Sequence, residues 1–374
     1  MSELFQQVEL KNLEIRNRFV MAAAADNLTG EEGRVTDAHI NRLVKLAKGG
    51  VGLIITGGVG VHESARSSPN SPSLARDDFI PDYKKLTREL HKYGAKVAAQ
   101  LCHSGIWTSF YQNKIGREAI APSVIASDSS YINKPFYPSM GKYHAATEEE
   151  ILEVIDAFAD AAYRAKIAGF DAVEIHGAHD SLLSQFLSPV TNERSDEWGG
   201  ALENRCRIHC QIGRAIRKRV SDDYFVILKL GVQDGFSGGL LFEEGKKAAN
   251  YAANNGFDAL EISQGLQGNT FNEMVIRPVP KNNEGYFRDW CREIKTSVNV
   301  KTIMTGGLRS FDLIQEIIDN NETDLIGLCR PLIRKLDLIN RWQSGDHTRA
   351  SCISCNKCVL ALAEGKPLAC YMDA

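Results

Sequence analysis

Apolar residues in this chain form short continuous runs, separated by segments that have the periodicity of amphipathic helices. Eight runs occupy residues 18–24, 52–58, 96–101, 172–177, 225–230, 259–265, 301–307 and 324–330. Runs that are apolar throughout, rather than at alternate positions, are typical of parallel strands buried on both faces. Helical periodicity covers residues 36–50 and 147–170, and Thr147 with Glu150 forms a capping box at the start of the second segment.

Eight strands that alternate with helices predict an α/β fold, a (β/α)8 barrel. The rival is an open, doubly wound sheet, which binds its ligand at a switch point after a glycine-rich turn. The stretch GGVGVH at 57–62 lacks the GxGxxG spacing. The barrel is therefore the favoured fold.

The chain is longer than the roughly 250 residues of a usual barrel, so appendages are expected. Residues 8–18 alternate like a hairpin and could plug the barrel bottom, and residues 102–146 make a long excursion suited to a lid. Residues 178–204 form a second long loop that we expect to be structural. We expect residues 1–340 to form the barrel and residues 341–374 a cysteine-rich tail.

Composition narrows the class of protein. The 374 residues are 24% charged and 43% hydrophobic, with a net charge of −3 and no basic block. Nucleic acid and anionic membranes are therefore not expected partners. There is no leader-like start, and no apolar run approaches the roughly 18 residues of a membrane span, so we expect a cytoplasmic protein. Homo-oligomerisation is left open.

Chemistry-bearing residues gather at the predicted carboxyl ends of the strands, where barrel enzymes have their active sites. In chain order they are Ala23, Ala24, Gly57, Gln100, His176, His179, Lys229, Gly306, Gly307, Cys329 and Arg330. Glycines after the seventh strand and a cation after the eighth are typical of a phosphate site. An amide, a cation and two imidazoles at the same mouth suit a planar ring with a phosphate tail, and flavin mononucleotide (FMN) fits.

Stretches that contain most of these residues resemble the Old Yellow Enzyme family of FMN oxidoreductases. The stretches are NRFVMA, GGVGLIITG, GAKVAAQLCHSG, APS, HGAHDSLLSQFLSPVTNERSDEWGGALENRCR, MTGG and CRPL. The resemblance implies that Gln100, Lys229, Gly307 and Arg330 contact FMN. It also implies that His176 and His179 hydrogen-bond the carbonyl oxygen of an activated alkene. Such donors stabilise the negative charge that develops during hydride addition.

Four of the nine cysteines crowd into the tail, at Cys352, Cys355, Cys358 and Cys370. In a cytosolic chain such a cluster indicates metal before disulfide. The segment CISCNKCVLALAEGKPLAC resembles the iron–sulfur segment of the 2,4-dienoyl-CoA reductase and trimethylamine dehydrogenase branch. That resemblance implies a [4Fe–4S] cluster that passes electrons to FMN. Structural zinc is the alternative, because four thiolates also bind zinc.

The chain departs from the family pattern in three respects. Ser181 stands where the family commonly has a proton-donating tyrosine, and Ile106 where it has an arginine. The cysteine-bearing relatives continue into a dinucleotide-binding half, so we expect a separate electron-donor protein, with direct reduction by NAD(P)H left open. Candidates for a displaced proton donor are Asp180, Tyr111, Tyr286, Cys102 and His103.

The sequence therefore predicts an FMN-dependent reductase of a carbon–carbon double bond conjugated to a carbonyl or thioester. One alternative is an amine dehydrogenase or demethylase, whose relatives attach FMN to a cysteine that MAAAADN lacks. A second is a flavin-dependent double-bond isomerase, because the tyrosine is missing. A non-enzymatic flavin-binding barrel with a zinc tail would leave the histidines, the cation and the phosphate loops idle. The substrate is a small unsaturated molecule whose identity the sequence does not give.

Overall fold

The predicted barrel is confirmed. The structure, a computed structural model, describes residues 2–127, 129–134, 140–280 and 283–372. The barrel strands are β3 (Phe19–Met21), β4 (Leu53–Ile55), β6 (Lys96–Cys102), β9 (Ala172–Gly177), β10 (Phe225–Gly231), β11 (Ala259–Ser263), β12 (Lys301–Met304) and β13 (Leu325–Leu328). Each pairs in parallel with the next along the chain, and β13 pairs with β3. The sheet therefore closes on itself, with no barrel edge left open.

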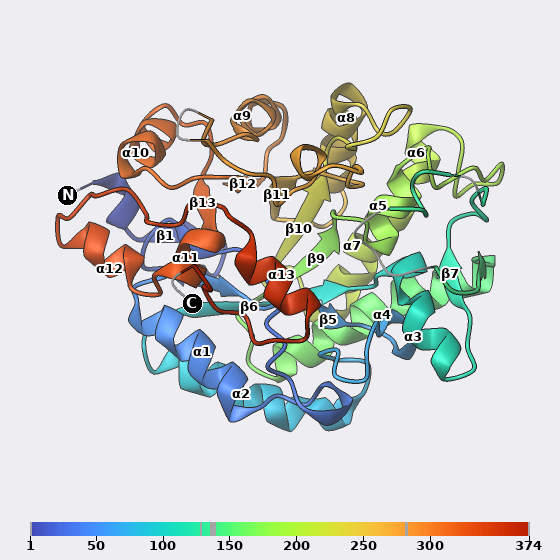
Figure 1. Ribbon diagram of the computed structural model, residues 1–374, viewed down its shortest axis with the longest axis horizontal. Coiled ribbons are helices and arrows are strands. Elements are labelled where there is room, and N and C mark those ends of the chain that lie inside the picture. The colour runs from blue at the N-terminus through green and yellow to red at the C-terminus, as the bar shows by residue number, and fades with distance from the viewer. Residues whose placement is uncertain (1, 128, 135–139, 281–282, 373–374) are drawn as a thin grey trace.

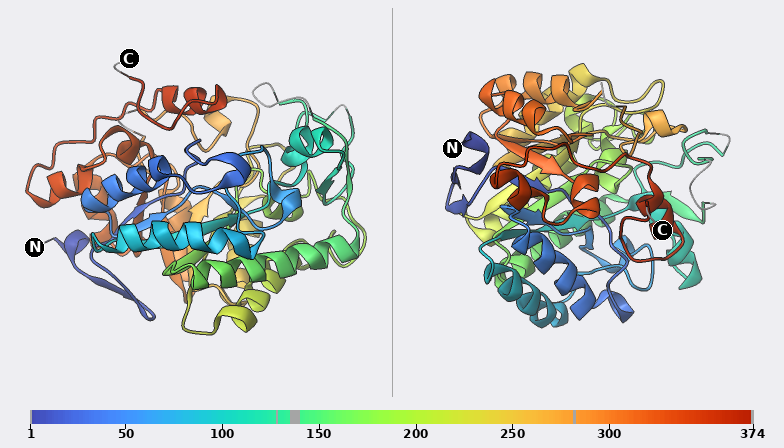
Figure 2. Two further views of the ribbon diagram at one scale, coloured as in Figure 1. Left: turned by 90° about the horizontal axis from the view of Figure 1, so that it is seen from below. Right: turned by 60° about the vertical axis from the view of Figure 1, so that its left-hand side comes forward.

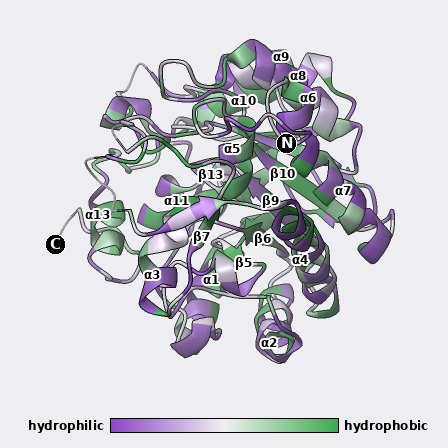
Figure 3. Cartoon of the chain, turned by 90° about the vertical axis from the view of Figure 1, so that its right-hand side faces the viewer, coloured by the Kyte–Doolittle hydropathy of each residue, from purple (hydrophilic) through white to green (hydrophobic). Residues whose placement is uncertain are grey.

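Helices surround this barrel (Figure 1). The main ones are α1 (Asp37–Lys48), α2 (Ile80–His91), α4 (Glu148–Ile167), α7 (Arg207–Val220), α8 (Phe242–Ala253), α9 (Arg288–Ser297) and α10 (Phe311–Asp319). The capping box that opens α4 is present, with Thr147 and Glu150 bonding each other's backbone N–H groups. Figure 3 shows that the central strands are largely hydrophobic and that the helices have a polar outer face. Because the strands are buried between the barrel interior and the helices, continuous apolar runs in the sequence correspond to strands.

The barrel interior is apolar at its lower end and is closed there by the N-terminal hairpin. The hairpin strands β1 (Val8–Leu10) and β2 (Leu13–Ile15) place Val8, Leu10, Leu13 and Ile15 in one cluster with inward residues of the barrel strands. The predicted plug is therefore confirmed. Figure 2 shows the hairpin on the opposite side of the barrel from the C-terminal tail.

The tail crosses the other end, over the carboxyl ends of the strands. After α11 (Arg330–Arg334) and α12 (Leu338–Gln343), it contains the short helix α13 (Lys357–Ala363). The backbone N–H of Leu368 donates to the carbonyl of Asp26 (2.9 Å), and the Asn27 side chain donates to the carbonyl of Leu362 (2.9 Å). The tail thus packs directly on the loop that follows the first barrel strand.

The excursion at residues 102–146 carries α3 (Ser109–Lys114) and the parallel strands β7 (Ala119–Ala121) and β8 (Tyr143–Ala145). Its inner face has a small apolar cluster that includes Ile106 and Tyr131. Whether it acts as a lid stays a prediction. Within the described ranges, the structure contains no helix long and apolar enough to span a membrane.

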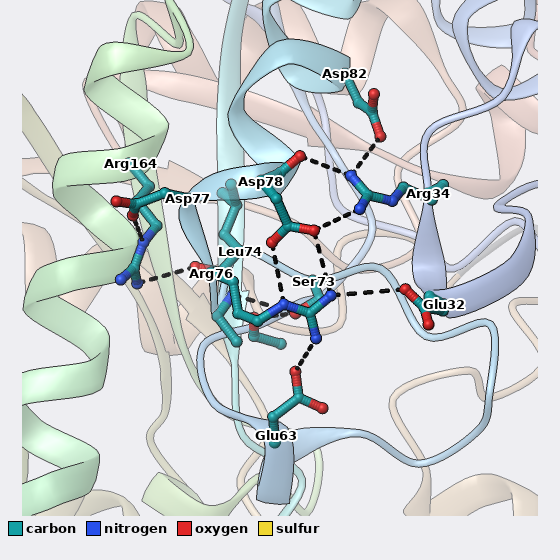
Figure 4. A network of polar contacts seen from close by, with 12 residues as sticks. Glu32, Arg34, Glu63, Ser73, Leu74, Arg76, Asp77, Asp78, Asp82 and Arg164 are labelled. Atoms are coloured by element: carbon teal, nitrogen blue, oxygen red, sulfur yellow. Dashed lines mark hydrogen bonds and ion pairs between the residues drawn. The ribbon is translucent and has the colours of Figure 1, made fainter.

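An ion-pair network fixes the loops after the first two barrel strands (Figure 4). Arg76 lies at its centre and pairs with Asp78 (3.0 Å), Glu63 (3.0 Å) and Glu32 (3.6 Å). Arg34 also pairs with Asp78. Isolated exposed pairs contribute little, but a shared arginine already held by one partner loses less side-chain entropy on binding the next. The network therefore holds these loops beside the barrel mouth.

Candidate active site

A cavity of about 1020 Å³, counting the part open to solvent, lies at the carboxyl ends of the barrel strands. Residues after β3, β12 and β13 line it, together with side chains from β10 and β11 and the underside of the tail. Eight of the residues singled out from sequence are at its wall: Ala23, Ala24, His179, Lys229, Gly306, Gly307, Cys329 and Arg330. Gly57 lines an adjoining cavity, which shares Ala25 and Leu362 with the first.

Lys229 and Gln100 belong to a buried polar group beneath this cavity. Lys229 Nζ donates to Glu261 Oε1 (2.6 Å), and Gln100 Nε2 donates to Glu174 Oε2 (2.6 Å). Two effects act on the pKa of Lys229: burial acts to lower it, and the neighbouring carboxyl groups of Glu261 and Glu174 act to raise it. The carboxyl groups have the larger effect, so the pKa is raised overall. Lys229 is therefore a permanent cation, and the atom of Gln100 left for a ligand is its carbonyl oxygen, an acceptor.

His176 and His179 lie together at the carboxyl end of β9. Their ring centroids are 5.3 Å apart, with the rings at 76°. His179 has a left-handed backbone (φ 53°), and its Nε2 is 2.6 Å from Ser263 Oγ. Burial, reinforced by the Lys229 charge, lowers the pKa of His176 to about 3 and that of His179 well below its usual range. Both imidazoles are therefore neutral, and each carries one N–H.

In the loops after β12 and β13, the backbone packs closely against neighbouring side chains and lines the cavity. Gly306 and Gly307 have left-handed backbones (φ 112° and 77°), and a Cβ on either would meet the ring of Tyr286 within 3 Å. The Arg330 guanidinium lines the cavity and is held by the side chain of Asn356 (2.8 Å). Glycine is needed at both positions, because a side chain there would be strained and would also clash.

Ser181 is not placed to donate a proton into the cavity. Its side chain is buried, its hydroxyl donates to the carbonyl oxygen of His176 (2.8 Å), and it caps the short helix α5 (Leu182–Leu187). Asp180 also points away, toward the excursion, where Lys134 Nζ lies 2.8 Å from its Oδ1. Ser181 therefore stabilises the local backbone and Asp180 stabilises the excursion, and neither side chain is directed at a ligand in the cavity.

The other proposed proton donors are dispersed. Tyr286 lines the main cavity, and its hydroxyl donates to the carbonyl of Val275 (2.6 Å). Cys102 lines the adjoining cavity, and burial raises the pKa of its thiol to about 11. His103 is fully buried and bonded to Ser64 and to the Gly105 N–H, which fits a structural role.

The four tail cysteines surround one small hollow beside the main cavity. Cys352, Cys355, Cys358 and Cys370 all line it, and so does Arg330. Ser354 and Asn356 have left-handed backbones (φ 57° and 59°), which turn the loop sharply between the cysteines. Within the described residues, no three His, Cys, Asp or Glu side chains are arranged to hold a metal ion, so a metal centre is not shown.

Several residues of the site were not predicted from the sequence. Glu174 and Glu261 could have been noticed, because each is a charged residue inside an otherwise apolar strand run. Arg309, which lines the cavity and donates to the carbonyl of Cys352 (2.9 Å), joins the phosphate-type loop to the tail. No local sequence pattern indicates that contact, which joins residues 43 positions apart in the chain.

Comparisons with known proteins agree with this geometry. Residues 3–349 match the model of the NADH:flavin oxidoreductase / NADH oxidase family. The chain is 34% identical to an NADH oxidase of Thermoanaerobacter brockii, over 94% of this chain and 52% of that protein. It is 34% identical to an NADPH dehydrogenase of Listeria monocytogenes, over 89% of this chain and 92% of that protein. It therefore spans about half the length of the first relative and nearly all of the second.

Among solved structures, a 2-naphthoyl-CoA reductase in complex with 2-naphthoyl-CoA superposes with a TM-score of 0.88 and 26% identity. The superposition covers 98% of this chain and 56% of that one, so the tail is included. A family match over most of the chain, supported by relatives above 30% identity, decides the assignment. The chain belongs to the NADH:flavin oxidoreductase / NADH oxidase family of flavin-dependent enzymes.

Proposed function

We propose that this protein is an FMN-dependent reductase of carbon–carbon double bonds conjugated to a carbonyl or thioester. The observation that carries the proposal is the pair of neutral imidazoles, 5.3 Å apart, beside the cavity that contains Lys229. Two neutral N–H donors close together, one of them (His179) at the cavity wall, can polarise a carbonyl oxygen without giving up a proton. A thioester is favoured by the likeness to the 2-naphthoyl-CoA reductase, which is in complex with 2-naphthoyl-CoA, a CoA thioester.

The residues present fit FMN. Gly306 and Gly307 line the cavity without side chains, so their backbone N–H groups are accessible to an anion. Arg330 supplies a cation at the same wall, and these residues would hold the phosphate. Lys229 and the Gln100 carbonyl oxygen would hold the ring from below, with Ala23, Ala24 and Gly57 packing against it and Cys329 beside the phosphate. His176 Nδ1 is buried with no hydrogen-bond partner, as expected of a group that faces a ligand.

The bound FMN would supply the hydride that adds to the double bond. His176 and His179 would hold the substrate oxygen as negative charge develops there, with His179 fixed by Ser263. Lys229 is a cation held by Glu261 and would favour a negatively charged ring above it. The proton for the other carbon would come from a group other than Ser181.

We further propose that Cys352, Cys355, Cys358 and Cys370 bind a [4Fe–4S] cluster in a tail formed by residues 341–374. All four surround one hollow, and Arg330, Ile333 and Ser354 line both this hollow and the main cavity, so the cluster would lie beside the FMN phosphate site. Thiolates that bind different irons of a cluster stand further apart than four thiolates on one zinc ion.

Anaerobic purification and reduction test the proposal. The protein should release FMN on denaturation. The flavin is then reduced with NAD(P)H or dithionite, and the protein is mixed with an α,β-unsaturated ketone or thioester. The flavin should be reoxidised, and one equivalent of product reduced at the double bond should form per flavin. In D2O the product should carry a solvent deuteron at the carbon that takes the proton. Dithionite supplies electrons but no hydrogen, so with this reductant the hydride position should carry a second deuteron. His176→Ala should slow reoxidation roughly 100- to 1,000-fold while FMN stays bound, with His91→Ala, an exposed helix-end residue, as the control.

Two results would contradict this assignment. A product with a shifted double bond, formed while the flavin remains reduced, would make the protein an isomerase. Oxidation of an amine at a rate above that of alkene reduction would make it a dehydrogenase of the amine class.

A further inference from the structure

Two glutamates lie inside the barrel, directly beneath the cavity. Glu174 on β9 and Glu261 on β11 are both fully buried, and β10 with Lys229 runs between these strands. They stand among apolar residues of the same strands, where a charge without a partner is costly. Two carboxyl groups therefore share this buried space with one lysine.

The hydrogen bonds account for only half of the carboxyl oxygens. Glu174 Oε2 accepts from Gln100 Nε2 (2.6 Å), and Glu261 Oε1 accepts from Lys229 Nζ (2.6 Å). The remaining oxygens, Glu174 Oε1 and Glu261 Oε2, are buried and receive no N–H or O–H donor from the described residues. The two carboxyl groups are near enough to each other, on either side of β10, for their charges to interact.

An ionised carboxylate can only accept hydrogen bonds. Two ionised carboxylates this close would repel each other. Together with the single Lys229 cation, they would give this buried set of three side chains a net charge of −1. One proton between them removes the repulsion, makes the contact a hydrogen bond and brings the net charge to zero.

We propose that Glu174 is protonated and donates its proton to Glu261, which stays ionised and holds Lys229. Glu174 is then a positioning residue: it fixes Glu261 and orients Gln100, while the cation of Lys229 remains available to the cavity above. The part that concerns FMN rests on the proposed function, and the proton itself does not.

The surrounding electrostatics agree with this assignment. Burial and then the Glu261 charge raise the pKa of Glu174 well above its usual range. Burial also acts to raise the pKa of Glu261, but Lys229 outweighs it and the pKa is lowered. The other groups that face this pair are Gln100 on β6, His176 on β9, Thr305 after β12 and Cys329 after β13. The Thr305 hydroxyl is directed at the Ile262 carbonyl (3.2 Å).

Carbon-13 NMR of the full-length protein, labelled at the glutamate carboxyl carbon, tests the proton directly. Near pH 8, where an ordinary glutamate is ionised, one resonance should remain at the position of a protonated acid. It should disappear in Glu174→Gln and persist in Glu14→Gln, an exposed hairpin residue. Only ionised glutamates in the wild-type spectrum would overturn the inference, and that spectrum decides even if Glu174→Gln fails to fold.

The reduction potential of bound FMN gives a second measurement. If Glu174 is already neutral, Glu174→Gln should leave the potential where it is, whereas Glu261→Gln should raise it by removing the anion that faces Lys229. A rise of the same size in both variants would show two ionised carboxylates and overturn the inference. If the protein contains the protonated glutamate but binds no FMN, the proposed function is wrong and the inference about the shared proton is still supported.

Discussion

Each site histidine is neutral because burial and a neighbouring cation disfavour its charged form. The pKa of His176 is lowered to about 3, and those of His103 and His209 to about 3 and about 4. We expect alkene reduction to show no loss from histidine protonation as the pH falls from 8 to 5. Stopped-flow reoxidation of the reduced flavin across that range measures this, and a fall centred near pH 6.5 would show that a site histidine titrates normally.

The same pKa shifts make a prediction for stability. An unfolded chain protonates its histidines near pH 6.5, whereas the folded chain leaves these three neutral down to about pH 4 or 3. The unfolded state therefore binds more protons in that window, and the free energy of unfolding should fall as the pH drops below about 6.5. Urea denaturation at a series of pH values gives the slope. His209→Asn should reduce it, because His209 is buried within α7, outside the cavity wall.

Ser181 makes a separate prediction at the residue scale. Its hydroxyl caps α5 and bonds the His176 carbonyl, so Ser181→Ala should cost about 1 kcal/mol of stability. The rate of alkene reduction should change little, since the hydroxyl donates to the backbone. Thermal unfolding and single-turnover rates on the same samples separate the two effects. A large loss of rate at unchanged stability would make Ser181 the proton donor after all.

At the scale of elements, the loop between β12 and α10 matters most. Gly306→Ala would place a Cβ about 2.9 Å from ring carbons of Tyr286, in a backbone with φ 112°. The strain should cost about 1 to 3 kcal/mol, and FMN retention should fall as well. Gly345→Ala is a matched control, because Gly345 also has a left-handed backbone (φ 98°) but has open space around its Cβ. Equal FMN retention in both variants would argue against a phosphate site at this loop.

At the scale of the whole molecule, the tail and the barrel form one site. The tail loop from Cys352 contacts Arg309, and Asn356 contacts Arg330, so both cavity arginines are held by tail groups. Cys352→Ser should abolish bound iron and acid-labile sulfide but leave FMN bound, because the contact to Arg309 uses the backbone carbonyl. Cys210→Ser, in α7, is the control. One zinc per chain with no sulfide in the wild type would replace the cluster with a structural zinc ion.

The architecture could be predicted from the sequence because burial has a local signature. Eight apolar runs separated by helical segments mark the strands of a barrel, and the alternation in residues 8–18 marks the hairpin that closes its lower end. Thr147 and Glu150 specify their cap within four residues of chain. The grouping of His176, His179 and Lys229 also followed, because parallel strands bring their carboxyl ends to one face.

Contacts between elements were decided only by the tertiary structure. Glu174 meets Glu261 because β9 and β11 flank β10 in a particular register, and no local pattern encodes that register. Ser181 turns to the His176 carbonyl because Asp180 before it has a left-handed backbone (φ 64°) and Leu182 after it begins α5. The tail reaches the loop after β3 across more than 300 residues of chain. Periodicity records whether a side chain is buried, whereas the packing of the whole chain determines its partner.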